Sequence, residues 1–275
     1  MNTFTLTEGH LPLLVSVPHA GTEIPSDLQQ SFTDKALQVE DTDWHLEKLY
    51  AFATSMGASL IAPRYSRYVI DLNRPPDNVP MYPGSNNTEL CPTRAFTGES
   101  IYQGAVPDKA EIARRVALYW QPYHIALATE LAKLKAIHGY ALLWDGHSIK
   151  SHLPWLFEGK LPDLNMGTAN GNSCHSSLQH ALEATLNKAC SSTHTSNNVF
   201  DYVFNGRFKG GYITRTYGQP AQNIHAVQLE MCWSTYMQEY TPNQATFELD
   251  AQRVANITPV LQALLQAMLN WKPTS

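Results

Sequence analysis

The chain has 275 residues, of which 43% are hydrophobic and 16% are charged, and its formal net charge is −5. This composition excludes a disordered chain, and it excludes a nucleic-acid binder that works through bulk positive charge. No apolar run approaches the roughly 18 residues of a membrane span, and residues 1–17 lack the features of a signal peptide. Four widely spaced cysteines without a C-x-x-C pair are typical of the reducing cytoplasm, where we expect the protein.

The first predicted element is a buried strand at Leu13–Val17, a short apolar run that Pro18 ends. A helix is expected to begin at Asp41–Asp43, because an acidic residue can cap the free amides of a first turn, and to end at Gly57. The next two predicted strands are Ser59–Ala62 and Tyr68–Leu72.

The stretch from Asn73 to Pro107 holds six of the 17 prolines and is not expected to form regular structure. A loop of this length in a compact domain is usually functional or flexible, and the sequence does not define its motion. The later predicted helices are Asp108–Ile137, interrupted near Pro122, Ser177–Cys190, and Phe247–Leu269, broken near Pro259. The later predicted strands are Tyr140–Trp144 and Ile224–Leu229. This alternation predicts an α/β fold with helices on both faces of a largely parallel or mixed sheet, in one domain over residues 1–275.

Three polar side chains stand at or just beyond the ends of predicted buried strands. His19 follows the first strand, His147 follows the strand that ends at Trp144, and Glu230 closes the strand that begins at Ile224. Sites in open α/β sheets form outside the carboxyl ends of the strands, so these side chains are expected to converge. Glu230 would then be a general base beside a metal.

Two histidines and one carboxylate, with an open fourth position, are the ligands of a catalytic zinc ion. His19 and His147 supply the two nitrogens. The carboxylate is expected from Asp43 or Asp41 at the start of the first helix, and Glu23, four residues after His19, is a rival ligand. The sequence alone leaves these three acids open.

Arginines in two separate motifs indicate a small acidic substrate. A guanidinium group binds a carboxylate at two points, which suits a substrate with carboxylate groups. The candidate substrate-binding residues are Arg67, Asn73, Arg74, Arg207 and Arg215.

Six motifs, in order along the chain, resemble those of the N-formylglutamate amidohydrolase family. They are VPHAGTEIP (Val17–Pro25), DTDWH (Asp41–His45), YSRYVIDLNRP (Tyr65–Pro75), ALLWDGHSI (Ala141–Ile149), NGRFKGGYITRTYG (Asn205–Gly218) and HAVQLEM (His225–Met231). The resemblance runs from about Leu13 to beyond Tyr236. It implies a three-layer α/β/α sandwich around a mixed sheet, similar to zinc carboxypeptidases and aspartoacylase-like hydrolases.

The resemblance also implies hydrolysis of N-formyl-L-glutamate to formate and L-glutamate, a step of histidine degradation, with a divalent metal expected to be Zn²⁺. Carried over position by position, the metal ligands are His19, Asp43 and His147. Glu230 matches the catalytic glutamate of the carboxypeptidases, and Asn73-Arg74 resembles the pair that holds their substrate's terminal carboxylate. The spacing of Glu23 after His19 differs from the H-x-x-E of those enzymes, which favours Asp43 as the ligand.

Three alternatives remain at this point. A related zinc N-acyl-amino-acid deacylase or carboxypeptidase-like amidase would use the same site with another acyl group. A non-haem iron oxygenase also uses two histidines and one carboxylate, but it has no use for Glu230. A non-catalytic carboxylate-binding protein is disfavoured because every expected ligand and the base are present. The expected partner is a small dicarboxylate, with neither nucleic acid nor membrane, and the sequence is compatible with a monomer without defining the oligomeric state.

Overall fold

The computed structural model describes residues 2–79, 88–191, 200–239 and 247–273, and it contains a seven-stranded mixed sheet. In spatial order the strands are β1 (Phe4–Thr7), β3 (Ser59–Pro63), β2 (Leu13–Ser16), β4 (Ala141–Ile149), β7 (Ile224–Cys232), β5 (Leu164–Gly167) and β6 (Tyr202–Phe204). The four central strands from β3 to β7 are parallel, whereas β1 pairs with β3 and β5 pairs with β7 in antiparallel fashion. The carboxyl ends of the parallel strands therefore meet at one edge of the sheet.

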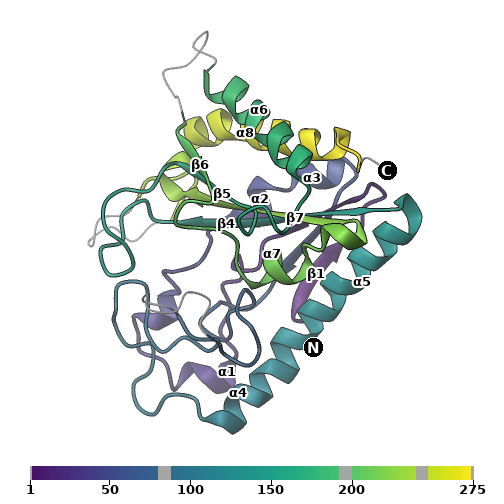
Figure 1. The fold of residues 1–275 in the computed structure, drawn as a ribbon. Helices are drawn as coiled ribbons and strands as arrows, with labels where there is room; N and C mark the ends of the chain where they lie inside the picture. Colours follow the sequence, from purple (N-terminus) through teal and green to yellow (C-terminus); the bar gives the residue numbers. More distant parts are fainter. Residues whose placement is uncertain (1, 80–87, 192–199, 240–246, 274–275) are drawn as a thin grey trace.

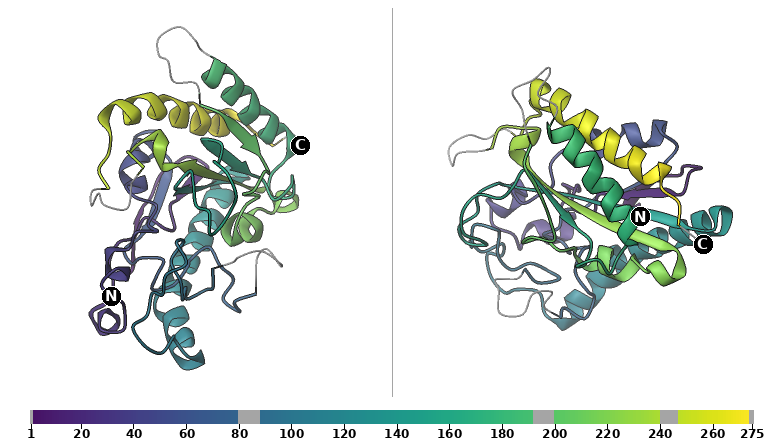
Figure 2. Two further views of the ribbon diagram at one scale, coloured as in Figure 1. Left: turned by 90° about the vertical axis from the view of Figure 1, so that its left-hand side faces the viewer. Right: turned by 45° about the horizontal axis from the view of Figure 1, so that its top comes forward.

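Helices cover both faces of this sheet (Figure 1). One face carries α6 (Ser176–Ser191), α8 (Ala251–Asn270) and the short helices α2 (Leu46–Leu49) and α3 (Phe52–Ser55), and the other carries α5 (Gln121–His138) and α7 (Tyr212–Tyr217). The turned views of Figure 2 show α6 and α8 lying side by side. Alternate residues of one strand enter different cores: Leu13 and Val15 pack on the α8 side, and Leu14 on the α5 side. The predicted three-layer α/β/α architecture is confirmed.

One predicted strand is wrong. Tyr68–Leu72 is buried but irregular: the Val69 amide closes a turn on the Ser66 carbonyl, and the Asp71 amide bonds the distant Leu90 carbonyl. The place next to β3 belongs to β1, which the sequence analysis did not predict. A short apolar run indicates burial, and burial alone does not distinguish a strand from a packed turn.

The expected helix from Asp41–Asp43 is wrong at its start. Regular helix begins only at Leu46, after His45 at φ 63°, and it is divided into α2 and α3. The Asp43 side chain turns away from the helix and contacts His147 instead of capping amides. The acidic cluster therefore serves tertiary contacts and not a helix terminus.

The long helical region is α4 (Lys109–Arg115), a π-helical turn η2 (Val116–Trp120) and α5, so the interruption predicted near Pro122 is a change of helical pitch. The closing helix starts at Ala251, where Asp250 caps it, and it runs unbroken through Pro259. Thus the predicted start at Phe247 and the predicted break are wrong, because the cap and the packing of the helix on the core decide its limits.

The other predicted elements are found at or near their expected limits. They are β2, β3, β4, β7 and α6. Residues 73–79 and 88–107 form neither helix nor strand, as expected, and residues 80–87 of that stretch lie outside the described residues. Both β4 and β7 are longer than predicted, so that His147 and Glu230 lie within the strands. Among the described helices, none combines the length and apolar character needed to cross a membrane.

A buried histidine at the start of β7 makes the fold sensitive to acid. His225 is 2% exposed, accepts a hydrogen bond from the His175 amide at 3.1 Å, and packs edge-on against Trp271 just after α8. Burial, together with the nearby His175, lowers the pKa of His225 to about 4 from an ordinary value of 6.5. The unfolded chain therefore binds the extra proton between these values, and stability present above pH 6.5 is lost as the pH falls toward 4.

At pH 5 this single histidine should cost about 2 kcal/mol of unfolding free energy. We expect His225→Gln to reduce the fall in Tm between pH 7 and pH 5 by several degrees, as measured by calorimetry. His180→Gln, which changes an exposed histidine of α6, is the matched control and should keep the wild-type fall. An unchanged fall in the His225→Gln variant would contradict the prediction.

Candidate metal and substrate site

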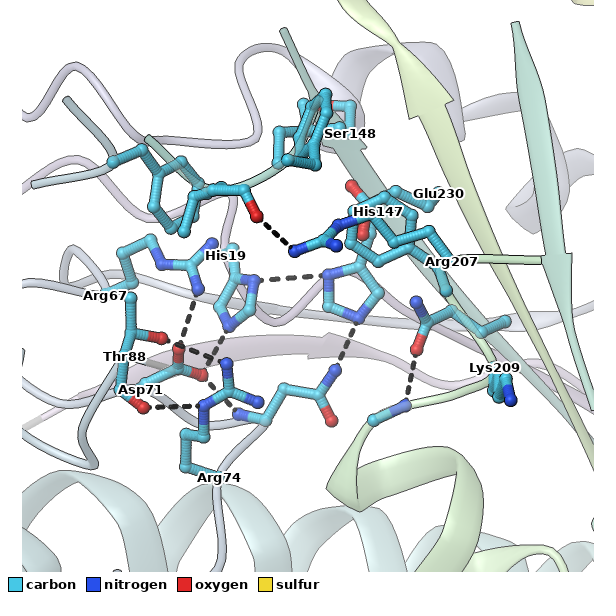
Figure 3. A pocket seen from close by; sticks show the side chains of 18 of the residues that line it. His19, Arg67, Asp71, Arg74, Thr88, His147, Ser148, Arg207, Lys209 and Glu230 are labelled. Atoms are coloured by element: carbon cyan, nitrogen blue, oxygen red, sulfur yellow. Dashed lines mark hydrogen bonds and ion pairs between the residues drawn. The ribbon is translucent and has the colours of Figure 1, made fainter. Parts of the chain in front are cut away.

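Three of the predicted side chains meet at the carboxyl edge of the central strands. His147 lies in β4, His19 follows β2, and Asp43 precedes α2, where its amide donates to the His19 carbonyl at 3.0 Å. His147 Nδ1 is 3.1 Å from Asp43 Oδ2 and 3.2 Å from His19 Nδ1. His19 Nδ1 is 3.7 Å from the same Asp43 oxygen. Figure 3 shows the imidazole rings of His19 and His147 next to each other in the lining of a pocket.

This cluster fits a divalent metal ion. Its three candidate ligand atoms all lie within 4.8 Å of one another, and all three residues are buried. Asp43 Oδ1 is buried and has no hydrogen-bond partner among the described residues, and Arg67 Nη1 forms an ion pair with it at 3.9 Å, too far to donate a hydrogen bond. This oxygen therefore has unused capacity to accept, which a metal ion would fill. Two imidazole nitrogens and one carboxylate are a donor set that zinc and other first-row metals accept.

Two further carboxylates contact the histidines at their Nε2 atoms, on the side away from the centre of the cluster. His19 Nε2 is 2.7 Å from Asp71 Oδ1, and His147 Nε2 is 3.1 Å from Asp145 Oδ1. Each Nδ1 is thereby left facing the centre of the cluster. A carboxylate on the outer nitrogen is the usual partner of a metal-bound histidine, since it fixes the ring and its tautomer. Neither Asp71 nor Asp145 was among the predicted site residues, although Asp145 lies two positions before His147 and therefore on the same face of β4.

The surroundings shift the pKa values of the two histidines in opposite directions. Burial opposes protonation of His147, but the carboxylates of Asp145 and Asp43 outweigh it and raise the pKa of His147 well above its usual value. Burial lowers the pKa of His19. Burial would raise the pKa of Asp71, but His19 and Arg67, whose Nη2 is 2.7 Å from Asp71 Oδ2, hold it well below its usual value.

Glu230 stands beside the cluster, as predicted. It is the register partner of His147 across the parallel β4–β7 pair, and it lines the pocket while only 8% exposed. Burial raises the pKa of its carboxyl to about 8. A carboxylate of this kind can exchange a proton near neutral pH, which is what a general base that later acts as an acid requires.

The rival acids lie elsewhere. Asp41 is buried and accepts a hydrogen bond from the Phe96 amide at 2.7 Å, and burial raises its pKa to about 6. Glu23 is half exposed and forms an ion pair with Arg64 at 2.8 Å. Of the three acids that the sequence left open, the geometry therefore brings only Asp43 to the histidines.

The pocket has a volume of about 350 Å³ and combines an apolar wall with several cations. The apolar side chains are Phe96, Leu156, Phe157 and Phe208. The cations are Arg67, Arg74, Arg207 and Lys209. Lys209 is an addition to the predicted set, although it lies in the same sequence motif as Arg207.

The predicted arginines differ in where they lie. Arg67 is buried against Asp71, and the half-buried Arg74 bonds the carbonyl and hydroxyl of Thr88. Arg207 is exposed at the pocket and bonds the Leu156 carbonyl. Arg215, on α7, is exposed and bonds the Gly210 carbonyl, and it does not line the pocket.

Asn73 lines the pocket, and its side-chain oxygen is hydrogen-bonded within the protein. Its Nδ2 is 2.9 Å from His147 Nε2, and its Oδ1 accepts a hydrogen bond from the Ile213 amide at 2.8 Å. The side chain therefore lies between the cluster and α7. The substrate-binding role that the resemblance implied for Asn73 stays a prediction.

Known proteins resemble this chain along most of its length. A model of the family described as N-formylglutamate amidohydrolase matches residues 11–237. Two relatives described as N-formylglutamate deformylase, from Pseudomonas putida and Pseudomonas aeruginosa, are each 47% identical over 96% of this chain and 94% of their own. The crystal structure of an N-formylglutamate amidohydrolase from Ralstonia eutropha superposes with a TM-score of 0.78 at 24% identity, and covers 98% of both chains. A crystal structure from Agrobacterium tumefaciens superposes at 0.72 and 17% identity, over 98% of this chain and 95% of the other. The two crystal structures share the fold described above.

The geometry predicts which acid controls metal content. We expect Asp43→Asn to lose most of the bound metal, because it removes the carboxylate between the two imidazoles. Glu23→Gln, the matched control, should keep the wild-type metal content. Elemental analysis of the purified variants, each dialysed against the same metal buffer, measures both. Full metal retention in Asp43→Asn would remove this residue from the ligand set.

Proposed function

Because the chain belongs to the N-formylglutamate amidohydrolase family, we propose that it hydrolyses N-formyl-L-glutamate to formate and L-glutamate. The observation that carries this proposal is the 47% identity, over 96% of the chain, to relatives described as N-formylglutamate deformylase. The acid, base and cationic side chains of one pocket support it. We further propose that the chain acts as one catalytic domain in the cytoplasm, in a route of histidine degradation.

His19, Asp43 and His147 would hold a divalent metal, which we propose to be Zn²⁺. When bound, such an ion polarises a carbonyl oxygen and lowers the pKa of its bound water. The chain's own contribution is to orient these ligands, through Asp71 behind His19 and Asp145 behind His147. The Ser148 amide also donates to Asp43 Oδ2 at 3.1 Å, which fixes the carboxylate.

Glu230 would move the proton. It accepts a proton from the water that attacks the formyl carbon, and it passes that proton to the amide nitrogen as the C–N bond breaks. The products are then formate and L-glutamate, whose amino group also takes up the proton that formic acid loses. The buried position of Glu230 beside His147 supports this role, because the carboxyl can hold a proton there at neutral pH.

The pocket cations would bind the two carboxylates of the substrate. Figure 3 shows Arg67 and Arg74 on one side of the metal cluster and Arg207 and Lys209 on the other. The ion pairs of the described residues include neither Arg74 nor Lys209, so both can meet a carboxylate of the substrate. Two cationic groups at separate places suit a substrate with two separated negative charges.

The activity itself is tested by adding N-formyl-L-glutamate to the metal-loaded protein and measuring the formate released. N-acetyl-L-glutamate and N-succinyl-L-glutamate, assayed in parallel, distinguish a deformylase from a deacylase of wider range. We expect the formyl compound to be the best substrate by kcat/KM. Faster hydrolysis of either larger acyl group would overturn the proposed substrate.

Removal of the proposed base should leave the metal and abolish turnover. We expect Glu230→Gln to retain metal and to lose about 100-fold to 10,000-fold in kcat, the usual range for a general base. Glu158→Gln, which alters an exposed carboxylate, should keep wild-type kinetics and serves as the control. Near-normal kcat in Glu230→Gln would end the assignment of the base.

The placement of the arginines predicts a difference in substrate affinity. Arg74→Ala should raise KM about 10-fold to 100-fold, the range for lost hydrogen bonds to a charged group. Arg215→Ala should leave KM within about twofold of wild type, because Arg215 lies outside the pocket lining. Steady-state kinetics of both variants, with metal content measured alongside, check the prediction. Equal effects of the two substitutions would show that the pocket does not bind substrate in this way.

A further inference from the structure

Two aromatic side chains of the long helical region hold the segment that crosses the site. Trp120, the last residue of η2, donates its indole N–H to the Arg74 carbonyl at 3.0 Å. His124, one turn later on α5, bonds the Leu72 carbonyl through Nε2 at 2.9 Å. Trp120 is 8% exposed and His124 is 4% exposed. The backbone is thus held on both sides of Asn73 by side chains from one helix.

The partners of His124 define its tautomer. A backbone carbonyl can only accept, so Nε2 carries the hydrogen, and Nδ1 accepts from the Tyr217 hydroxyl at 2.9 Å. Burial lowers the pKa of His124 to about 4, so the ring is neutral at neutral pH. Both nitrogens of the ring are therefore used for fixed hydrogen bonds, which leaves His124 no role in proton transfer.

The helix geometry brings the two rings together. Trp120 and His124 stack with ring centroids 3.7 Å apart and an interplanar angle of 23°. The π-helical turn that ends at Trp120 comes immediately before α5, in which Pro122 lacks a backbone N–H. Such turns replace regular helical hydrogen bonds and recur at functional sites. The stacked pair therefore forms one rigid support.

The supported segment connects the metal cluster with the substrate pocket. The Asn73 amide group contacts His147, and the Asn73 backbone N–H donates to Asp71 Oδ1, which also bonds His19. The next residue, Arg74, lines the pocket. A shift of this backbone would move the guanidinium group away from the position in which it meets a carboxylate.

We propose that Trp120 and His124, here called the carbonyl clamp, are positioning residues that hold Leu72–Arg74 so that Arg74 is preorganised for a substrate carboxylate. This inference rests on the proposed function, since it requires Arg74 to bind the substrate. The clamp lies behind the segment and bonds only its carbonyls, so it acts on the substrate through Arg74 and not by direct contact.

The first test is Trp120→Phe in the metal-loaded enzyme, which removes the indole N–H and keeps a large ring. We expect KM for N-formyl-L-glutamate to rise about three- to tenfold, the effect of one lost hydrogen bond, with kcat within about twofold of wild type. Trp271→Phe is the matched control, because Trp271 is also 8% exposed and donates its indole N–H to one partner, the Ser177 hydroxyl, outside the site. An equal KM in the two variants would overturn the proposal.

A double-mutant cycle separates positioning of Arg74 from a general structural effect. In an Arg74→Lys background, Trp120→Phe should change KM by less than about twofold, because the group that it positions is already altered. A full, additive rise in KM would overturn the proposal. The dissociation constant for L-glutamate, measured by calorimetry, gives the same readout without turnover. A chain that neither releases formate nor binds L-glutamate overturns both the proposed function and the clamp, whereas normal kinetics in Trp120→Phe overturn the clamp alone.

The second half of the clamp provides a rescue test that does not depend on the tryptophan variant. His124→Gln can still donate an N–H toward the Leu72 carbonyl, whereas His124→Met has a similar length and no donor. We expect His124→Met to lower kcat/KM about three- to tenfold, through KM, and His124→Gln to restore it to within about twofold of wild type. Identical kinetics of the two variants would overturn the role of His124.

Discussion

The parallel pairing of β4 with β7 is the constraint on which the site depends. The two strands are paired along nine positions each, from Ala141↔Ile224 to Ile149↔Cys232, and they form the middle of the sheet. This register places His147 beside Glu230, although the two lie far apart in the sequence. A shift by one residue would turn either side chain to the opposite face of the sheet. The proposed metal ligand and the proposed base therefore stay together only as long as this pairing holds.

The distribution of partners among the buried carboxylates gives the site its second property. Asp71 is satisfied by His19, Arg67 and a backbone amide, and Asp145 by His147 and the Thr214 hydroxyl at 2.8 Å. Buried charges persist in a fold when they are paired in this way. Asp43, in contrast, keeps one oxygen that has no hydrogen-bond partner among the described residues and only an ion pair with Arg67 at 3.9 Å. Both oxygens of Asp71 and of Asp145 thus have hydrogen-bond partners, whereas one oxygen of Asp43 does not. This difference suits two carboxylates that orient the histidines and a third that would bind a metal.

The sequence predicted where a side chain lies when that position follows from the pattern of strands. It did not when the position depends only on tertiary contacts. His19, His147 and Glu230 could be predicted because each follows or closes an apolar strand, and parallel strands end at one edge. The choice of Asp43 over the neighbouring acids came only from the family resemblance and not from the strand pattern, because it depends on how the backbone turns after His19. The period of two along β4 carried a signal for Asp145 that was available and unused. Arg215 and Lys209 share one motif, and only the course of α7 shows which of them reaches the pocket. In the same way, the apolar residues 68–72 predicted burial correctly and the strand wrongly.

The irregular stretch around the site is held in place by specific hydrogen bonds. The Asp71 amide bonds the Leu90 carbonyl at 2.7 Å, the Leu90 amide bonds Asn78 Oδ1 at 2.6 Å, and Arg74 bonds Thr88. Functional loops are useful when a rigid scaffold positions them. Here the scaffold is the long helical region of η2 and α5, whose side chains bond backbone carbonyls of the loop. The side chains of the loop therefore remain available to the pocket. Since Asn73 contacts the proposed metal ligand His147 and its neighbour Arg74 lines the pocket, one short piece of backbone would connect the proposed metal site with the proposed substrate site. Loss of regular structure in this stretch therefore reflects a backbone whose shape is set by the site and not by a repeating hydrogen-bond pattern.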